Sequence, residues 1–309
     1  MPIKVILDVD TGADDAVALL LAGHHPALAL AAVTVTHGNA GLDTTLDNTL
    51  RVLEAGGLRQ APVYAGAGRA LLAAPPPVFA IQSATLPLPA ATFGPQPRHA
   101  VNFLIDYYRG PDGPETTYVP VGPMTNLALA LRLEPTLATR IPHIVTMAGA
   151  YVEGNSTPSA EFNVLADPEA ADIVFRAGIP LTMIGLEVTA QALVTPADLA
   201  RLRARGTPLA ALGAGLIEEQ IRWFLDHGGE GGQVYDACAV AAVIDTGLVR
   251  TRHRHVAIEL TGQLTRGRTV ADMAGAHTGT PNVAVGVGID RGRFVEILLE
   301  GLGGRKDEG

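Results

Sequence analysis

The sequence predicts an α/β protein built on an open, mainly parallel, twisted sheet with helices on both faces. Short runs rich in Val, Ile and Leu alternate with stretches of helical pattern from residue 3 to residue 185. These runs are mainly apolar, as expected for parallel strands buried on both sides. In addition, 48% of the 309 residues are hydrophobic but only 5% are aromatic, which suits aliphatic helices packed on such a sheet. In these folds ligands bind beyond the carboxyl ends of the strands.

Strands and helices are expected to follow one another in a regular βα order. The apolar runs predict strands at 3–9, 28–36, 116–121, 143–147 and 180–185. Helical patterns predict helices across 16–22, 43–55, 126–132 and 167–175. The last of these has the clearest start, because Asp167 can cap its free N–H groups and Pro168 suits the first helical position. Three further runs, at 255–261, 269–272 and 282–289, predict a β-rich ending.

No internal repeat and no clear linker divides the chain, so a single domain over residues 1–309 is expected. The proline-rich stretch 75–97 is expected to form a long mobile loop within it. Residues 303–309 are expected to be a frayed tail.

Charge and composition disfavour several classes of partner. The formal net charge of −9 disfavours nucleic acid and anionic membranes, because phosphate binding requires a basic surface. No apolar stretch approaches the length of a membrane span and no signal segment is recognisable, so a cytoplasmic protein is expected. The single cysteine, Cys238, excludes an intramolecular disulfide and is expected to be a small core residue.

The sharpest chemical feature is a group of four carboxylates at the end of the first strand. Asp8, Asp10, Asp14 and Asp15 fall within one short segment, and Gly12 permits a tight turn between strand and helix. The helix dipole favours an acid in the first turn by only ~0.3–1 kcal/mol. Two carboxylates about 4 Å apart repel by roughly 4 kcal/mol at an effective dielectric near 20. Either some of these groups are protonated or a cation lies among them. If a metal ion is the cation, oxygen ligands without nearby His or Cys favour Ca²⁺ or Mg²⁺ over zinc.

Two other interpretations of these carboxylates stay open at this point. They could be helix caps and solvated turn residues. Alternatively, Asp8 or Asp10 could be the aspartyl nucleophile of a phosphatase, since that class also carries an Asp-x-Asp motif after its first strand. The phosphatase motif usually has Thr or Val at the position of Gly12, and the pair Asp14 and Asp15 follows too closely for it.

Further polar motifs follow the later strands. The turns after the second and third expected strands read His37-Gly38-Asn39 and Val121-Gly122-Pro123-Met124-Thr125-Asn126. A central block and a late segment add Met147-Ala148-Gly149-Ala150-Tyr151, Glu153-Gly154-Asn155, Ala160-Glu161-Phe162-Asn163, Asp167-Pro168-Glu169-Ala170-Ala171 and Asp236-Ala237-Cys238-Ala239-Val240-Ala241. With the opening acidic segment, and in this order, they resemble the signatures of the nucleoside hydrolase family, the inosine–uridine-preferring type. The resemblance runs from residue 3 to about residue 290 and implies a Rossmann-like core.

The resemblance also implies an activity and a set of site residues. The activity is hydrolysis of the N-glycosidic bond of ribonucleosides, with Ca²⁺ as cofactor and a homodimer or homotetramer as the assembly. The implied metal ligands are Asp10, Asp15, Asp236 and the backbone carbonyl of Val121, and Asp10 would also take the proton of the metal-bound water. The residues implied to hold the ribose are Asp14, Asn39, Met147 through its backbone, Asn155, Glu161, Asn163 and Asp236. Carboxylates suit this reaction because they stabilise an oxocarbenium-like sugar, and a metal lowers the pKa of its bound water.

The chain departs from the family pattern at the base end of the expected site. Tyr235 stands where the family usually carries the His that protonates a purine leaving group, and the stretch 75–97 lacks the usual His as well. A free Tyr has a pKa near 10, so it is a less suitable acid at neutral pH. His37 and His227 are substitute candidates, although surface or structural roles are favoured for both.

Several alternatives therefore remain open. Trp223 and Phe224 could stack on a base, although a core role is favoured for both at helical spacing. A family member that binds a riboside with weak turnover is one alternative function, and the phosphatase is a second. The base preference stays open.

Overall fold

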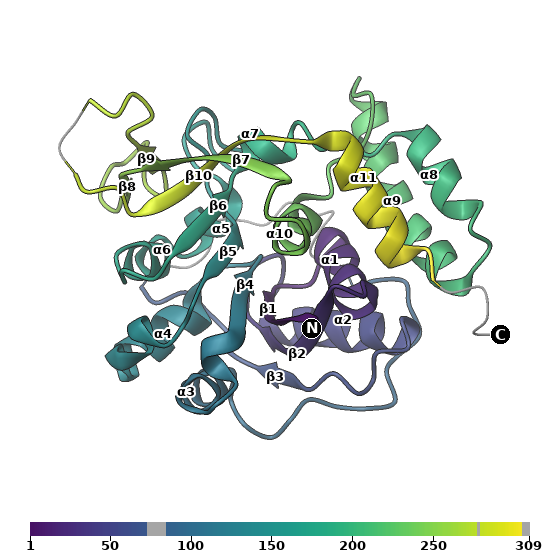
Figure 1. Ribbon diagram of the computed structural model, residues 1–309, viewed down its shortest axis with the longest axis horizontal. Coiled ribbons are helices and arrows are strands. Elements are labelled where there is room, and N and C mark those ends of the chain that lie inside the picture. Colours follow the sequence, from purple (N-terminus) through teal and green to yellow (C-terminus); the bar gives the residue numbers. More distant parts are fainter. Residues whose placement is uncertain (73–84, 277–278, 305–309) are drawn as a thin grey trace.

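An eight-stranded sheet forms the centre of the protein (Figure 1), and the fold class predicted from the sequence is confirmed. The computed structural model describes residues 1–72, 85–276 and 279–304. In the order in which they lie side by side, the strands are β3 (Val63–Ala65), β2 (Leu28–Val35), β1 (Ile3–Val9), β4 (Thr116–Pro120), β5 (Ile144–Met147), β6 (Leu181–Ile184), β10 (Val283–Ile289) and β7 (Val249–Arg254). All neighbours are parallel except β7, which runs antiparallel to β10 at the edge. A separate hairpin pairs β8 (Val256–Ile258) with β9 (Thr269–Ala271).

Helices cover both faces of the sheet (Figure 1). One face carries α1 (Ala13–His24), α2 (Leu42–Ala55), α8 (Pro196–Arg203), α9 (Pro208–Asp226), α10 (Tyr235–Ile244) and α11 (Arg291–Leu302). The other face carries α3 (Ala100–Arg109), α4 (Thr125–Leu133) and α6 (Pro168–Phe175). The short helices α5 (Phe162–Ala166) and α7 (Leu186–Thr189) and two 3₁₀ turns, η1 (Gly113–Glu115) and η2 (Pro135–Thr139), complete the described elements.

Strand β1 shows why apolar runs predicted the buried strands. Val5, Leu7 and Val9 pack into the core beneath α1, whereas Ile6 packs into the opposite core beneath α4. Successive side chains of a strand point to opposite faces, so a strand buried on both sides is apolar at nearly every position. The predicted strands and helices of the first 190 residues are all present, with ends shifted by a few residues at most.

The prediction was incomplete where the apolar pattern is weak or ambiguous. Edge strand β7 was missed, because it reads Val-Arg-Thr-Arg-His-Arg and most of its side chains are exposed. Helix α10 was missed because its Ala- and Val-rich sequence has no face that is distinctly apolar. The three strand runs predicted after residue 254 are present as β8, β9 and β10, but helix α11, which follows them, was missed. Gly303, directly after α11, is buried and its carbonyl accepts a hydrogen bond from the Thr207 hydroxyl at 2.8 Å.

Part of the predicted loop is described, and that part is attached to helix α2. The Leu86 N–H donates to the Asn48 side chain at 2.8 Å, and Arg51 donates to the Leu88 carbonyl. Residues 73–84 of this region and residues 305–309 of the expected tail lie outside the described residues.

The strand order positions a site at one edge of the sheet. From β1 the chain crosses to β2 on one side, whereas the later strand β4 lies on the other side of β1. Parallel sheets open a crevice at such a switch point, beyond the carboxyl ends of the strands. The segments that follow β1, β2, β4 and β5 all lie at this end, and they carry the motifs that the sequence singled out.

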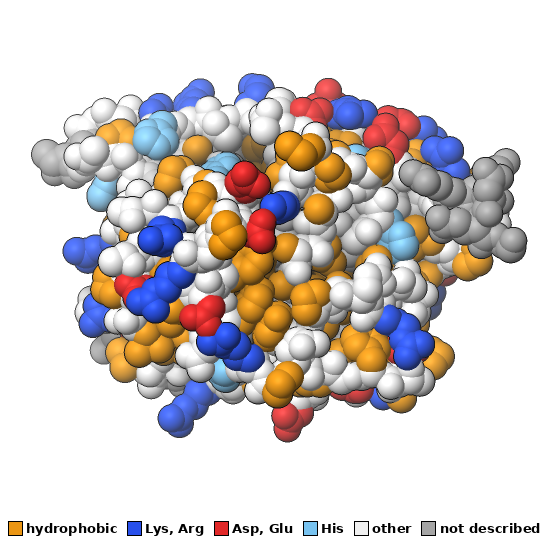
Figure 2. Space-filling model, turned by 60° about the horizontal axis from the view of Figure 1, so that its bottom comes forward, with side chains coloured by type: hydrophobic (Ala, Val, Ile, Leu, Met, Phe, Trp, Pro, Cys, Tyr) orange, Lys and Arg blue, Asp and Glu red, His pale blue; other side chains and the backbone are white. Residues whose placement is uncertain are grey.

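Charged side chains of both signs lie scattered over one face of the molecule (Figure 2). On the face shown in Figure 2, Lys and Arg side chains are scattered, often beside acidic ones, around a central area of hydrophobic side chains. None of the helices in the described part of the chain has the length and apolar character that a bilayer crossing requires.

Candidate active site

The turn between β1 and α1 holds its carboxylates in a network of backbone donors. Asp15, in the first turn of α1, accepts hydrogen bonds from the backbone N–H of Gly12 at 2.9 Å and of Asp10 at 3.1 Å. Asn39, from the turn after β2, donates its side-chain amide to Asp15 at 3.1 Å and its backbone N–H to Asp10 at 2.6 Å. Two strand ends are therefore joined through two carboxylates.

Two glycines leave room for the Asp10 carboxylate. A Cβ atom at Gly122, after β4, would lie 2.5 Å from Asp10 Oδ1, and one at Gly38 would lie 2.0 Å from Asp10 Oδ2. Real Cβ contacts are not that short, so any larger residue would displace the carboxylate. The Gly-containing turns after β2 and β4 are thus needed for the position of Asp10 as well as for the turns themselves.

A third acid joins from far along the chain. Asp14, Asp15 and Asp236, the last in the first turn of α10, are buried and each offers an oxygen within 4.8 Å of the others. Burial, together with the charge of Asp15, raises the pKa of Asp14 to about 7, and burial raises the pKa of Asp15 to about 6. Burial and the charges of Asp14, Asp15 and Asp10 also raise the pKa of Asp236 well above its ordinary value. Without a cation these carboxyl groups keep their protons to a higher pH than exposed carboxyl groups do.

The residues of this cluster fit a divalent metal. All donors are oxygens, which Ca²⁺ prefers, and Asp14 Oδ1 is buried with no hydrogen-bond partner among the described residues. Buried polar atoms without partners are rare in native structures, so this oxygen is suited to an ion. The tight group contains Asp14, whereas the sequence indicated Asp10 beside Asp15 and Asp236. Asp10 lies next to the group, and one of its oxygens accepts the short hydrogen bond from Asn39.

The opposite wall is built around Asn163 and Glu161. The Asn163 amide donates to the carbonyl of Val121 at 2.7 Å and to that of Met147 at 3.0 Å, which ties together the ends of β4 and β5. Glu161 accepts hydrogen bonds from the N–H groups of Gly149 at 2.8 Å and Asn163 at 2.8 Å. Neither side chain is free to turn away from the carboxylates.

A cavity of about 510 Å³ lies between these walls and contains nearly all of the predicted site. This volume is in the range of small-molecule sites. Every predicted site residue except Asp15 lines it: Asp10, Asp14, Asn39, Val121, Met147, Asn155, Glu161, Asn163, Tyr235 and Asp236. Asp15 lies behind them and contacts the site through Asp10, Asn39 and the acidic group. Asn155 is exposed at the cavity edge, where its side chain accepts from the Phe162 N–H at 2.9 Å.

The candidate acids differ in whether they reach this cavity. Tyr235 lines it, and burial with the charges of Asp14, Asp236 and Glu161 raises its pKa above the ordinary value. His37 does not line it; the ring is buried and its Nε2 lies 3.1 Å from the Thr125 hydroxyl. Burial lowers the pKa of His37 to about 4. His37 is therefore a neutral structural residue.

The remaining candidates are settled by their surroundings. His227 is exposed at the end of α9 and does not line the cavity. Cys238 is fully buried, as expected, and burial raises the pKa of its thiol. Asp8 is buried outside the cavity, where one oxygen accepts from Thr34 at 2.6 Å and Asn126 at 2.8 Å. Asp8 thus cannot reach a phosphoryl group in the cavity.

Sequence reasoning missed one wall of the cavity. The last turns of α9 contribute Glu219, Gln220, Arg222 and Asp226, and the described end of the proline-rich region contributes Thr85, Leu86 and Pro87. With its amide oriented to satisfy both atoms, Gln220 accepts from the Asp14 N–H at 3.2 Å and donates to the Gln233 carbonyl. No sequence motif marks these residues, because a polar helix end is typical of any exposed helix. Phe224 also lines the cavity, whereas the Trp223 side chain is outside the described part.

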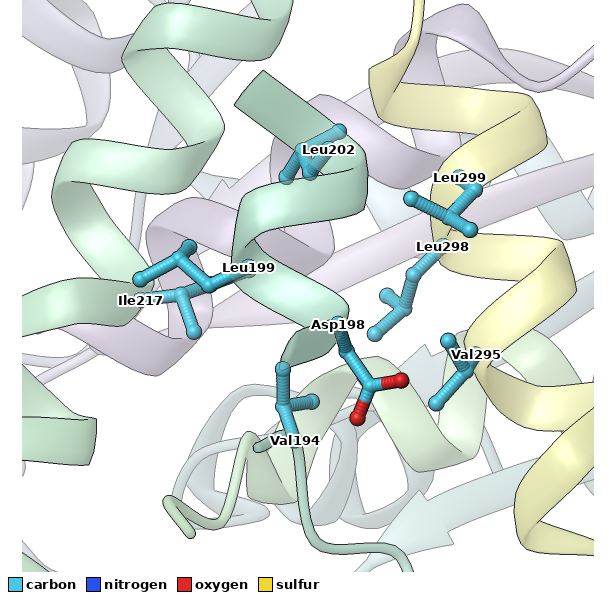
Figure 3. Close-up of a pocket in the computed structure, with 8 residues that line it drawn as sticks. All are labelled: Val194, Asp198, Leu199, Leu202, Ile217, Val295, Leu298 and Leu299. Atoms are coloured by element: carbon cyan, nitrogen blue, oxygen red, sulfur yellow. The ribbon is translucent and has the colours of Figure 1, made fainter. Parts of the chain in front are cut away.

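A second cavity is too small to matter for this chemistry. It measures about 10 Å³ and lies between α8, α9 and α11 (Figure 3). The side chains drawn there are aliphatic apart from Asp198, which caps α8 and pairs with Arg291. A space of that size holds at most one water molecule.

Comparisons with known proteins agree with the geometry. The family model described as inosine-uridine preferring nucleoside hydrolase matches residues 5–296. The pyrimidine-specific ribonucleoside hydrolase RihB of Escherichia coli (strain SE11) is 38% identical over 303 residues, which cover 96% of each chain.

Solved structures are similar over nearly the whole length. A purine-preferring ribonucleoside hydrolase from Gardnerella vaginalis is 32% identical with a TM-score of 0.89, covering 97% of this chain and 98% of its own. The plant nucleoside hydrolase PpNRh1 is 28% identical with a TM-score of 0.88, covering 99% of this chain and 100% of its own. The chain therefore belongs to the inosine-uridine preferring nucleoside hydrolase family and is an N-ribosyl hydrolase that converts ribonucleosides to ribose and free base.

Proposed function

We propose that this enzyme is calcium-dependent and that it acts by attack of water on C1′ of a bound ribonucleoside. One observation carries the proposal. A cavity of about 510 Å³ is lined by buried carboxylates together with Asn163 and Glu161, so oxygen atoms are the main polar groups in its wall. A cationic sugar and a hydrated divalent cation both suit such surroundings, whereas an anionic substrate does not.

Asp10, Asp15, Asp236 and the Val121 carbonyl would hold the ion, and Asp14 is close enough to Asp15 and Asp236 to contribute. When bound, Ca²⁺ would orient the attacking water, lower its pKa and engage ribose hydroxyls. The Asn163 hydrogen bond to the Val121 carbonyl leaves one lone pair of that oxygen available.

The protein's own side chains would carry out the remaining steps. Burial and the neighbouring charge of Asp15 raise the pKa of Asp10, which makes it a stronger base than an exposed carboxylate, and we assign it the proton of the attacking water. Asp14, Asn39, Asn155, Glu161, Asn163, Asp236 and the backbone at Met147 would hold the ribose. As the C1′–N bond lengthens, the surrounding carboxylates stabilise positive charge on the sugar.

Pyrimidine ribonucleosides are the proposed substrates. One support is the 38% identity to a relative named as pyrimidine-specific. The other is Tyr235, which stands where the family usually carries the His that protonates a purine leaving group. We further propose, from the resemblance to the family, a single-domain cytoplasmic protein that assembles as a homodimer or homotetramer.

Release of ribose from uridine, 2′-deoxyuridine and inosine tests the proposal, alongside elemental analysis of the purified protein. We expect one tightly held Ca²⁺ per chain and fastest turnover of uridine. Loss of the 2′-hydroxyl leaves buried polar groups unpaired at ~1–3 kcal/mol each, so deoxyuridine should be at least ~10-fold slower in kcat/KM. Active protein without any divalent metal, or equal turnover of uridine and deoxyuridine, would refute it. Riboside binding without ribose release would support the weak-turnover alternative instead.

A further inference from the structure

The last two turns of helix α9 bring a single positive charge to an otherwise acidic cavity. Glu219, Arg222 and Asp226 are three and four residues apart, so they lie on one face of the helix, and all three line the cavity. Arg222 is the one Lys or Arg side chain among the described residues of the lining. It is exposed, and it forms no hydrogen bond or ion pair with another described residue. An unpaired guanidinium at this place is available to a ligand.

The buried acids and Arg222 lie at different parts of the cavity. Asp10, Asp14, Asp236 and Glu161 are nearly inaccessible to solvent and occupy the inner part. A ribose held there would direct its base toward the outer lining, which includes Thr85 to Pro87 and the exposed end of α9. The base therefore lies on the same side of the cavity as Arg222.

Breaking the N-glycosidic bond separates charge between the sugar, at the inner part of the cavity, and the base, at the outer part. The sugar becomes positive while the bonding electron pair moves onto the base nitrogen. Carboxylates that stabilise the positive sugar disfavour the electron pair that collects on the base. A cation on the base side offsets this unfavourable effect on the leaving base, because opposite charges at the two ends of the cavity favour the charge separation.

We propose that Arg222 contacts the departing base and stabilises it as an anion, which favours uracil-type bases whose ring carbonyls share the negative charge. This inference rests on the proposed function. Water oxygen forms the new bond to C1′ and its proton passes to Asp10. The C1′–N electron pair leaves with the base, and the base anion takes up a proton from solvent after release. A planar guanidinium suits this role because it can donate two parallel hydrogen bonds to a carbonyl and an adjacent ring nitrogen.

Kinetics with uridines of graded leaving-group acidity test the proposal. In Arg222→Gln, kcat/KM for uridine should fall about tenfold, the effect of a charge interaction of about 1.4 kcal/mol. The fall should be smaller for 5-fluorouridine, whose base is more acidic, so the dependence on leaving group becomes steeper. Arg222→Lys keeps the charge and should recover most of the loss.

Two control variants separate charge from structure. Glu219→Gln removes a negative charge from the same face of α9 and should raise uridine turnover by a few-fold. Arg176→Gln, at an exposed Arg directly after α6 whose ion pair within the described residues is with Asp172, should leave uridine turnover unchanged. If Arg222→Gln slows both uridines equally, or Glu219→Gln and Arg222→Gln both slow uridine, a charge effect on the base is refuted.

Calorimetric binding of base analogues needs no turnover and keeps this inference distinct from the proposed function. Barbiturate is an anionic pyrimidine at neutral pH, whereas uracil is neutral. Native protein should bind barbiturate about tenfold more tightly than uracil, and Arg222→Gln should abolish that preference. Absence of any ribose release from all ribosides would overturn the proposed function, while the barbiturate preference would still report on Arg222. Equal barbiturate affinity of native protein and Arg222→Gln would overturn the role of Arg222.

Discussion

Replacing Tyr235 by His should restore an efficient acid for purine leaving groups. Tyr235 lines the cavity beside Asp14, Asp236 and Glu161, whose negative charges add to burial in raising the pKa of its phenol. The phenol therefore stays protonated at neutral pH, but its acidity is poorly matched to proton transfer there. A His at this position has an ordinary pKa of about 6.5. The same three carboxylates would raise the pKa of the imidazole and oppose the effect of burial, which keeps it near neutrality.

The size of the effect follows from this match. General acids with a pKa near the working pH contribute about 10²–10⁴-fold in rate. A purine departs best when its ring is protonated, so Tyr235→His should raise kcat/KM for inosine by up to that factor. Nitrophenyl riboside needs no proton to depart, so its turnover should change little. Both substrates make the same sugar contacts, and their ratio therefore isolates departure of the base.

The assay is release of ribose or nitrophenolate by native protein, Tyr235→His and Tyr235→Phe at several pH values. In Tyr235→His, inosine turnover should decline at high pH as the imidazole loses its proton, which a mere change in packing would not produce. Rapid inosine hydrolysis by native protein that persists in Tyr235→Phe would refute the reasoning, because another group would then supply the proton.

Two further predictions concern the carboxylates. Gly122→Ala puts a Cβ 2.5 Å from Asp10 Oδ1 and should lower kcat about 10²-fold, as displacing a catalytic group by an ångström can. The matched control Gly41→Ala, whose Cβ would have nothing within 4 Å, should leave kcat unchanged. Equal activity of the two variants in ribose-release assays would contradict the assigned role of Asp10. Raised carboxylate pKa values favour the folded state when these groups are protonated, so the stability contributed by Asp14 and Asp15 is full below about pH 4 and is lost as pH rises through about 6 and 7. Removing divalent metal with a chelator should therefore lower Tm by several degrees at pH 8 but much less at pH 5, and a thermal melt with the same loss at both pH values would count against metal binding here.

Much of the candidate site could be predicted from the sequence because its first half is local. Asp10, Gly12, Asp14 and Asp15 are neighbours along the chain, and the end of a buried strand followed by a helix start fixes their relative positions. The motifs after β2, β4 and β5 were added through the resemblance to the nucleoside hydrolase family, and they meet because parallel strands end at the same edge of a sheet. The strands themselves were predictable since burial on both faces requires continuous apolar runs.

Tertiary structure alone decided which groups meet. Packing of α10 and α9 against α1 brings Asp236 into the acidic group and Gln220 to the Asp14 backbone, and no local pattern encodes such contacts. The same packing places Arg222 in the cavity lining, while His37, next to the site in sequence, lies against Thr125 instead. Residue types and strand ends are properties of short segments, so the sequence by itself determined the fold class and the chemistry of the inner site. The shape and charge of the base side depend on how distant helices pack, and only the folded chain decides that.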